Sequence, residues 1–452
     1  MEDIAESQLD ELKKICPTYY IRGQPEYQEQ KKPWSIAANR NPTLNVVKHL
    51  YSSILDFAIR STGTGSSSAH DVILSTQGFK SFEFDPGTEI ATVGAGISWG
   101  EVDKLVDFHA PGYGAVAARC PWVGVAGCPM AGGFSWLSHE HGLVSDPQNL
   151  IDAQVVLRDG RVVWAKADGE DDLVWGLRGG GGNFGVVSAL KFHLKRVSSK
   201  IFAAMITVPY SSLVETSEAT AAMHRRATDP KIAMFVANQG PGMGQPSQGA
   251  RPGIVITAID IHGEAHARSE EGFAWAYKLS GAVEVAAGEM GLQQVNNLSA
   301  GYGAWQGTSR YRCAAPLISK VDDDFIVRLW QWFEDTYKVH PGFEVGSAII
   351  FELMQEAVFN SVPSPASTVA LVTTPKDTSE DVENKASTQL QKLGDQITAG
   401  KGFHGEYFTA FLYEWNYMRQ VLVEVKQKYD PDDRFNKGID VGSQRVSKGM
   451  TV

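Results

Sequence analysis

The 452-residue sequence has few cysteines, no long apolar run and no excess of positive charge. Four cysteines are too few for a disulfide framework, so each is expected to be a small buried residue, with one exception given below. The net charge of −11 argues against nucleic acid or an anionic membrane as the main partner. We read no membrane-spanning stretch and no secretory signal in the acidic amino terminus, which favours a cytoplasmic location.

Glycine, by contrast, is abundant, with 45 residues, and its densest clusters lie between residues 120 and 187. They include 123–127 (VGVAG), the pair Gly132 and Gly133, and 178–187 (RGGGGNFGVV). Glycine permits positive φ and lets the backbone approach a ligand closely. Repeated clusters of this kind predict a chain wrapped around a large, flat, polar ligand, and hence a cofactor enzyme.

Gly180, Gly182 and Gly185 fit the GxGxxG pattern of nicotinamide sites. That fingerprint needs a strand before the glycines and a helix after them. Here residues 171–177 favour a short helix, and the alternating apolar residues of 186–194 favour a strand. Because the order is reversed, the sequence argues against a Rossmann site.

The pattern of expected secondary structure changes near residue 200. Residues 1–42 are interpreted as a polar arm, and short strands and turns dominate 43–200. Beyond them, longer strands are expected at 201–209, 231–237, 253–261, 347–353 and 368–374. Helices are expected at 214–227, 266–279, 322–338 and 379–397. This alternation is typical of an antiparallel sheet covered by helices. A last helix, from about 414 to 429, should end before Pro431 and pack back on the first region.

Together these features resemble the FAD-linked oxidases of the berberine-bridge-like group, within the vanillyl-alcohol-oxidase fold. The similarity runs from about Tyr20 to Phe435 and is strongest at 57–65, 94–102, 120–156, 169–192 and 413–435. It implies an α+β chain with a two-part FAD-binding domain over 1–200, on which 405–452 packs. A substrate domain with a helix-covered antiparallel sheet would occupy 201–404.

The resemblance also implies the cofactor contacts. The loop 60–65 would cradle the FAD pyrophosphate with consecutive backbone N–H groups, and 123–127 would follow the ribityl and diphosphate chain. The residues assigned to FAD in this way are Ser61, Thr62, Gly63, Thr64, Gly65, Gly94, Gly96, Cys120, Val123, Gly124, Val125, Ala126, Gly127, Gly142, Leu143, Asp146, Asn149, Asn183, Gly185, Val187 and Asn416.

The sequence departs from the family pattern at three places. Thr64 stands where many members attach the flavin through histidine, so a covalent link would be a single thioether at Cys120, with noncovalent FAD as the alternative. Cys128 replaces a histidine near the ribityl chain and is a weaker hydrogen-bond donor. The segment 42–59 is short. The helix expected from Asn45 leaves no room for a strand that the family places before it. Its loss could weaken flavin binding or mark a truncated gene product.

Three residues are candidates for removing a proton from the substrate: Glu352, Tyr413 and Tyr417. Glu352 alternates with Phe351 on a predicted strand, and a solvent-facing strand carboxylate is the competing interpretation. Tyr413, Asn416 and Tyr417 match a family motif that faces the flavin. His139 and His141 lack the i, i+4 spacing of a zinc protease, so no metal site is expected.

The sequence therefore predicts an FAD-dependent oxidoreductase that transfers hydride from a small, natural-product-like substrate to the flavin, with O2 as the expected acceptor. Two alternatives stay open. The same fold could catalyse a redox-neutral cyclisation or isomerisation, or the chain could be a noncatalytic member with impaired FAD binding. The sequence identifies neither the substrate nor the oligomeric state.

Overall fold

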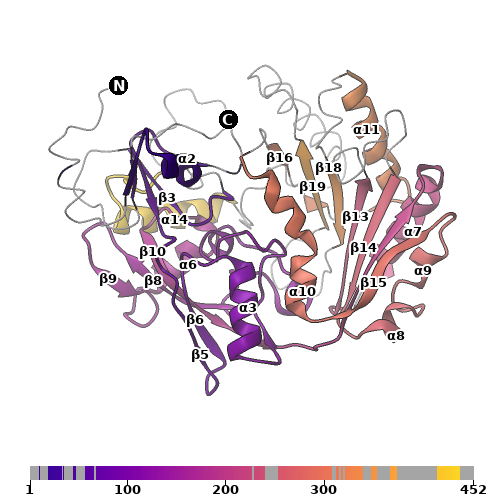
Figure 1. Cartoon of the computed structure of the whole chain (residues 1–452), viewed down its shortest axis with the longest axis horizontal. Coiled ribbons are helices and arrows are strands. Elements are labelled where there is room, and N and C mark those ends of the chain that lie inside the picture. The colour runs from indigo at the N-terminus through magenta and orange to yellow at the C-terminus, as the bar shows by residue number, and fades with distance from the viewer. Residues whose placement is uncertain are drawn as a thin grey trace.

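The structure is a computed structural model that describes most of the chain. The described residues are 10, 19–32, 34, 44–46, 56–65, 68–226, 229–239, 253–307, 312–314, 317–318, 321–339, 348–353, 367–373 and 415–437. Two regions lie side by side, one built on several small sheets and one on a single large sheet (Figure 1). The α+β class predicted from the sequence is confirmed. Among the described helices, none is both long and apolar enough to cross a membrane.

The first small sheet has the strand order β1-β2-β4-β3. Its strands are β1 (Tyr19–Ile21), β2 (Leu44–Val46), β4 (Val72–Ser75) and β3 (Phe57–Arg60), and α2 (Pro25–Lys31) follows β1. The segment 1–42 is therefore more than a polar arm. The expectation of a helix from Asn45 is also wrong at its start, because β2 hydrogen-bonds in parallel along the free edge of β4. Residues 47–55 lie outside the described part.

The second sheet is five-stranded, in the order β5-β6-β10-β8-β9, and all of its pairs are antiparallel. Its strands are β5 (Phe82–Asp85), β6 (Ile90–Gly94), β10 (Val186–His193), β8 (Leu150–Val156) and β9 (Val162–Trp164). Helix α6 (Asp171–Gly180) precedes the glycine cluster and β10 follows it, as the sequence predicted. A dinucleotide fingerprint of the Rossmann type is thus absent at this position.

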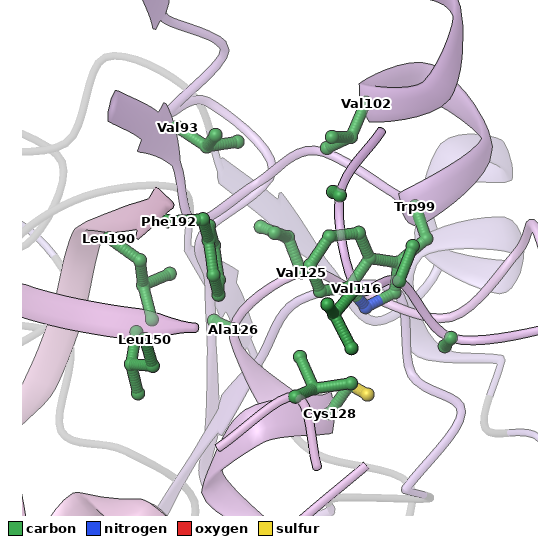
Figure 2. Packing of buried hydrophobic residues seen from close by; sticks show 14 of the residues in the cluster. Val93, Trp99, Val102, Val116, Val125, Ala126, Cys128, Leu150, Leu190 and Phe192 are labelled. Atoms are coloured by element: carbon green, nitrogen blue, oxygen red, sulfur yellow. The ribbon is translucent and has the colours of Figure 1, made fainter. Parts of the chain in front are cut away.

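Shorter elements connect and cover this sheet. Helix α3 (Trp99–His109) begins at a capping box, in which Ser98 and Glu101 each bond the other's backbone N–H. The remaining elements are α4 (Gly127–Met130), α5 (Ser138–His141) and the small pair β7 (Tyr113–Gly114) with β11 (Lys195–Arg196). Figure 2 shows the core between α3 and the sheet, where Val125 and Ala126 pack near Phe192. The rings of Trp99 and Phe192 lie 5.2 Å apart.

The large sheet has the order β15-β12-β14-β13-β18-β19-β16, with β17 beside β19. Its strands are β12 (Ile201–Val208), β13 (Ile232–Gln239), β14 (Gly253–Asp260), β15 (Val283–Met290), β16 (Arg312–Ala314), β17 (Leu317–Ile318), β18 (Ala348–Leu353) and β19 (Ser367–Thr373). All five strands expected in this region are confirmed. Strand β15 was not predicted, because its burial pattern is almost uniformly exposed.

Helices α7 (Leu213–Arg226) and α11 (Phe325–Val339) contact each other and contribute to a core with the large sheet. The single helix expected over 266–279 is wrong. Two short helices stand there, α8 (Glu264–Ala267) and α9 (Ala274–Tyr277), because the chain turns tightly at Gly272, where a Cβ would overlap the carbonyl of His266. The other short elements are η2 (Tyr210–Ser212), α10 (Leu292–Asn296) and η3 (Asn297–Trp305). The helix expected over 379–397 lies outside the described residues.

Helix α14 (Trp415–Tyr429) packs on α6 of the first region. A Cβ on Gly180 would lie 2.8 Å from Leu422 Cδ2, so some glycines of the 178–187 cluster serve close helix packing. The buried Nζ of Lys426 donates to the carbonyls of Asn183 and Phe435 and to the carboxylate of Asp430. The chain beyond the helix is thereby fixed beside the turn that leads into β10.

Candidate functional site

A cavity of about 340 Å³ lies where four segments of the first region meet. They are the loop after β3, the segment around α4, the turn before β10 and the chain after α14. The lining residues are Phe57, Ile59, Arg60, Ser61, Thr62, Gly63, Thr64, Gly65, Thr76, Val123, Gly124, Ala126, Gly127, Cys128, Met130, Ala131, Gly182, Gly185, Val187, Phe435, Asn436 and Lys437. Segments more than 300 positions apart in the sequence thus form one site.

The loop after β3 is held tightly in place. Gly63 has φ +88°, which only glycine adopts without strain. Ser61 Oγ donates to the carbonyl of Ala95 at 2.8 Å, and a Cβ on Gly124 would lie 2.6 Å from that Oγ. The two glycine-rich segments therefore approach each other so closely that Gly124 can carry no side chain without displacing the loop.

Arg60 is the cation at the base of this loop. Its guanidinium is buried and donates to the carbonyls of Gln30 at 2.6 Å and Lys31 at 2.9 Å. Burial lowers the pKa of Arg60 to about 10. Its Nε has no partner among the described residues. A buried guanidinium without a carboxylate partner favours an anion in the adjoining cavity.

The composition of the cavity fits a dinucleotide. The loop offers backbone N–H groups and the hydroxyls of Thr62 and Thr64, and Lys437 stands at the edge in an ion pair with Asp56 at 2.5 Å. Apolar side chains, among them Ile59 and Phe435, form the other wall. A volume near the lower end of ligand pockets, about 300–1,000 Å³, would hold one part of FAD rather than the whole molecule.

Eleven of the residues predicted for FAD line this cavity: Ser61, Thr62, Gly63, Thr64, Gly65, Val123, Gly124, Ala126, Gly127, Gly185 and Val187. Nine others do not line it: Gly94, Gly96, Cys120, Val125, Gly142, Leu143, Asp146, Asn149 and Asn183. Asn416 belongs to α14, but its side chain lies outside the described part, as does all of Tyr413.

Contacts within the protein account for several of these nine residues. A Cβ on Gly94 would overlap the carbonyl of Phe79, and one on Gly96 that of Thr76. Val125 points into the core of Figure 2. Asn149 Nδ2 donates to the carbonyls of His141 and Leu143. These contacts shape the segments around the cavity, and direct cofactor contact by the nine stays a prediction.

Three further residues, two after α5 and one before β10, stabilise the local backbone conformation. Gly142 has φ +80°, and Asp146 accepts the N–H of Leu143 at 2.9 Å. Asn183 donates to the carbonyl of Gly180 at 2.6 Å. Sequence reasoning missed Phe57, Ile59, Thr76 and the end segment 435–437 as lining residues. The end segment could have been expected from the predicted end of the last helix before Pro431, because the chain that follows a helix packed on the first region stays beside that region.

Cys128, singled out as a departure from the family, lines the cavity, whereas Cys120 does not. Both are free thiols. Burial raises the pKa of both, that of Cys128 to about 12, so both are neutral thiols near pH 7. Neither thiolate is preformed, because desolvation outweighs the nearby charge of Arg119.

Glu352 is buried, so the competing interpretation of a solvent-facing carboxylate is wrong. Both of its oxygens accept hydrogen bonds from the guanidinium of Arg119, the second at 3.0 Å. Arg119 is covered by aromatic rings, with Phe235 at 4.6 Å and Trp136 at 5.3 Å from its Cζ. The ion pair joins β18 of the large sheet to the residue directly before Cys120.

His139 is a buried core residue. Its Nδ1 lies 2.8 Å from the carbonyl of Ile232, and desolvation lowers its pKa to about 4, so the ring is neutral at pH 7. His139 and His141 belong to no cluster of metal-ligating atoms within the described residues. The structure instead groups Asp229, His262 and His266, which the sequence did not single out.

Comparison with known proteins confirms the resemblance. Residues 37–166 match the family described as FAD binding domain. Berberine bridge enzyme-like 23 of Arabidopsis thaliana is 37% identical over 131 residues, which cover 29% of this chain and 24% of that protein. Xylooligosaccharide oxidase of Thermothelomyces thermophilus is 33% identical over 153 residues, covering 34% and 30%. The chain thus spans about a quarter to a third of the length of these curated relatives.

The fold is shared along almost the whole chain. The crystal structure of 6-hydroxy-D-nicotine oxidase from Arthrobacter nicotinovorans superposes with a TM-score of 0.77 at 19% identity, covering 94% of this chain and 97% of the other. A berberine bridge enzyme variant in complex with (S)-reticuline gives a TM-score of 0.76 at 15% identity, covering 96% of this chain and 98% of the other. At these identities the likeness establishes the fold.

Proposed function

We propose that this chain, a relative of the berberine-bridge-type FAD oxidases in part of its sequence and in its fold, is an FAD-dependent oxidoreductase. Its substrate would be a small organic molecule of the natural-product kind, and O2 the electron acceptor. The observation that carries the proposal is the cavity in which Arg60 and the glycine loop 61–65 meet Gly124 and the chain after α14. Bound FAD would supply the hydride acceptor.

The chain's own residues would hold the cofactor. Backbone N–H groups and hydroxyls of the loop 61–65 would bind the pyrophosphate, with Arg60 as the buried cation beneath it. Apolar residues of the opposite wall, such as Val187 and Phe435, would exclude water. If a covalent link exists, we propose Cys120 as its only anchor, because Thr64 cannot serve.

For proton removal we propose Glu352, with Tyr413 and Tyr417 as the other candidates. Support for Glu352 comes from its burial and from its place opposite Arg119, whose next residue is the candidate anchor Cys120. Arg119 holds the carboxylate in position and occupies both oxygens. To accept a proton, Glu352 must use a lone pair that Arg119 leaves free, since each carboxylate oxygen has two.

Flavin content after a substitution that fills the cavity tests the proposal. Gly127 lines the cavity, and a Cβ there would meet no protein atom within 4 Å. The change Gly127→Val therefore occupies ligand space without straining the fold, and purified variant should lose the yellow colour of the parent. The matched control is Gly288→Val on β15, where a Cβ also meets nothing and the cavity is remote.

A colourless parent protein, or a Gly127→Val variant with parental flavin content, would refute FAD binding in this cavity. Anaerobic mixing with a panel of oligosaccharides and alkaloid-type amines then separates the remaining alternatives. Bleaching of the flavin by one of them, reversed by air, is expected for an oxidase. Product formation without bleaching would indicate the redox-neutral alternative.

The covalent link is tested by acid precipitation. Colour released to the supernatant means noncovalent FAD. Colour kept in the pellet of the parent and lost in Cys120→Ala is expected for a thioether at Cys120. If Cys128→Ala loses the bound colour instead, the anchor is the thiol that lines the cavity.

A further inference from the structure

A cluster of metal-ligating side chain types, none of which lines the cavity, lies at one end of the large sheet. Strands β13 and β14 are antiparallel neighbours, with Ile232 opposite Asp260. The residues before β13 and after β14 therefore meet at the same end of the sheet. This places Asp229, which precedes β13, beside His262 in the turn after β14 and His266 in α8.

The three side chains converge on one point. Asp229 Oδ2 lies 2.9 Å from His262 Nε2 and 3.8 Å from His266 Nε2. The three ligand atoms lie within 4.8 Å of one another. A tetrahedral Zn²⁺ with bonds of about 2.0–2.2 Å separates its ligands by about 3.3–3.6 Å. Shifts of an ångström or less would therefore bring the three atoms to coordination distance.

A buried carboxylate holds the imidazole of His266 and the backbone of His262. Asp260 is fully buried, and its Oδ2 accepts from His266 Nδ1 at 2.7 Å while its Oδ1 accepts the backbone N–H of His262 at 2.9 Å. A hydrogen bond on Nδ1 leaves Nε2 of His266 as the metal-facing atom. This carboxylate–histidine arrangement is what metal-ligating histidines in proteins usually show.

The backbone conformation at Gly263 also brings the two histidine side chains together. Gly263, between the two histidines, has φ +96°, a conformation that side chains rarely adopt. The resulting turn brings the two imidazole rings to 4.4 Å between centroids. The ligand side chains are about one-third exposed, at 32% for Asp229 and 36% for His262. An ion could thus enter from solvent and keep at least one water ligand.

We propose that Asp229, His262 and His266 form a site for a divalent transition-metal ion of the Zn²⁺ class. Two imidazoles and one carboxylate leave a fourth position for water. On binding, the Nε2 proton that His262 shares with Asp229 passes to solvent, Nδ1 keeps or takes up a proton so that the ring is a neutral imidazole, and the lone pair freed on Nε2 binds the metal. Because the ligands come from both sides of the β13–β14 pair, the ion would clip this end of the large sheet.

The test measures Zn²⁺ binding to the full chain after chelator treatment, by isothermal titration calorimetry. One Zn²⁺ per chain is expected for the parent and for the control His109→Ala, which removes an exposed histidine of α3. Binding should be lost in His266→Ala. Asp260→Asn, which changes the group that holds His266 Nδ1 and the backbone of His262 but none of the three ligands, should weaken affinity by about 10–100-fold.

Asp229→Asn keeps the size of the side chain and should also lose the site, so the test survives misfolding of the histidine variant. Co²⁺ as a second probe should give ligand-field bands at wavelengths beyond those of oxidised flavin, absent in Asp229→Asn. No stoichiometric Zn²⁺ binding by the parent would overturn the proposal. So would equal binding by parent and His266→Ala, which would leave the cluster as a histidine–carboxylate hydrogen-bond network.

Discussion

The two regions of this protein are built in different ways. In the first, short strands of two to eight residues are linked by glycine turns with positive φ, such as those at Gly63 and Gly142. In the second, four strands of eight residues, β12 to β15, pair along most of their length, with one register shift between β12 and β15. In the first region, backbone segments surround the cavity. In the second, a regular sheet carries the side chains.

Polar groups cross the boundary between the regions. Arg119 of the first region binds Glu352 of β18, and Asn296 of α10 donates to Asp103 of α3 at 3.1 Å. A division of labour follows from the comparison. Changes in the glycine loops should alter cofactor content, and changes on the large sheet, Glu352 included, should alter turnover.

The largest expected effect is at Glu352. If Glu352 is the base, Glu352→Gln should keep its flavin and reduce it about 10²–10⁴ times more slowly with substrate, since general-base removal has that cost. Stopped-flow absorbance under anaerobic conditions measures the rate. Glu334→Gln, which changes another buried carboxylate in the same region, is the control. A parental rate in Glu352→Gln would shift the role to Tyr417, tested by Tyr417→Phe.

The next effect concerns the segment that closes the cavity. Lys426→Met leaves Asp430 and the carbonyls of Asn183 and Phe435 without their buried cation, which should lower the free energy of unfolding by about 3–5 kcal/mol. Urea denaturation measures the loss. Lys428→Met removes a half-exposed ion pair two residues on and should cost about 0–1 kcal/mol. Equal losses of unfolding free energy in the two variants would contradict the role of Lys426 in holding the chain after α14.

A pH-dependent effect is expected from Asp103, because desolvation raises its pKa to about 8. The folded state then holds a proton that the unfolded chain releases near its ordinary pKa. The contribution of Asp103 to the free energy of unfolding is fully present below about pH 4 and is lost as the pH rises toward 8. The slope would be at most about 1.4 kcal/mol per pH unit. Asp103→Asn should flatten denaturation midpoints across this window, whereas Asp107→Asn should leave most of the slope.

The smallest effect is expected at the edge of the large sheet. Val285 of β15 is 58% exposed. Val285→Thr keeps the β-branch and should change unfolding free energy by no more than about 0.5 kcal/mol, as measured by thermal denaturation. A loss above 1 kcal/mol would show that another surface covers β15, and would weaken the comparison drawn above.

Strand and helix positions in the second region were largely predictable, because an alternating pattern such as that of β14 reports local backbone geometry. The predictions were wrong where tertiary contacts, rather than the local residue pattern, determine the secondary structure. One helix over 266–279 became two around Gly272, and β15 was invisible because it buries little. In the first region, β2 formed where a helix was expected, because the edge of β4 takes a partner.

The sequence alone determined the glycine framework, the reversed order around 178–187 and the resemblance to FAD-linked oxidases, since these depend on residue type and spacing. Only the tertiary structure decided which residues meet. Val125 and Gly127 belong to one motif, yet one lies in the core and the other at the cavity. Asp229 and His262 are 33 positions apart and meet through the pairing of β13 with β14. Contacts of this kind depend on strand register and on the packing of distant segments, which residue spacing does not encode.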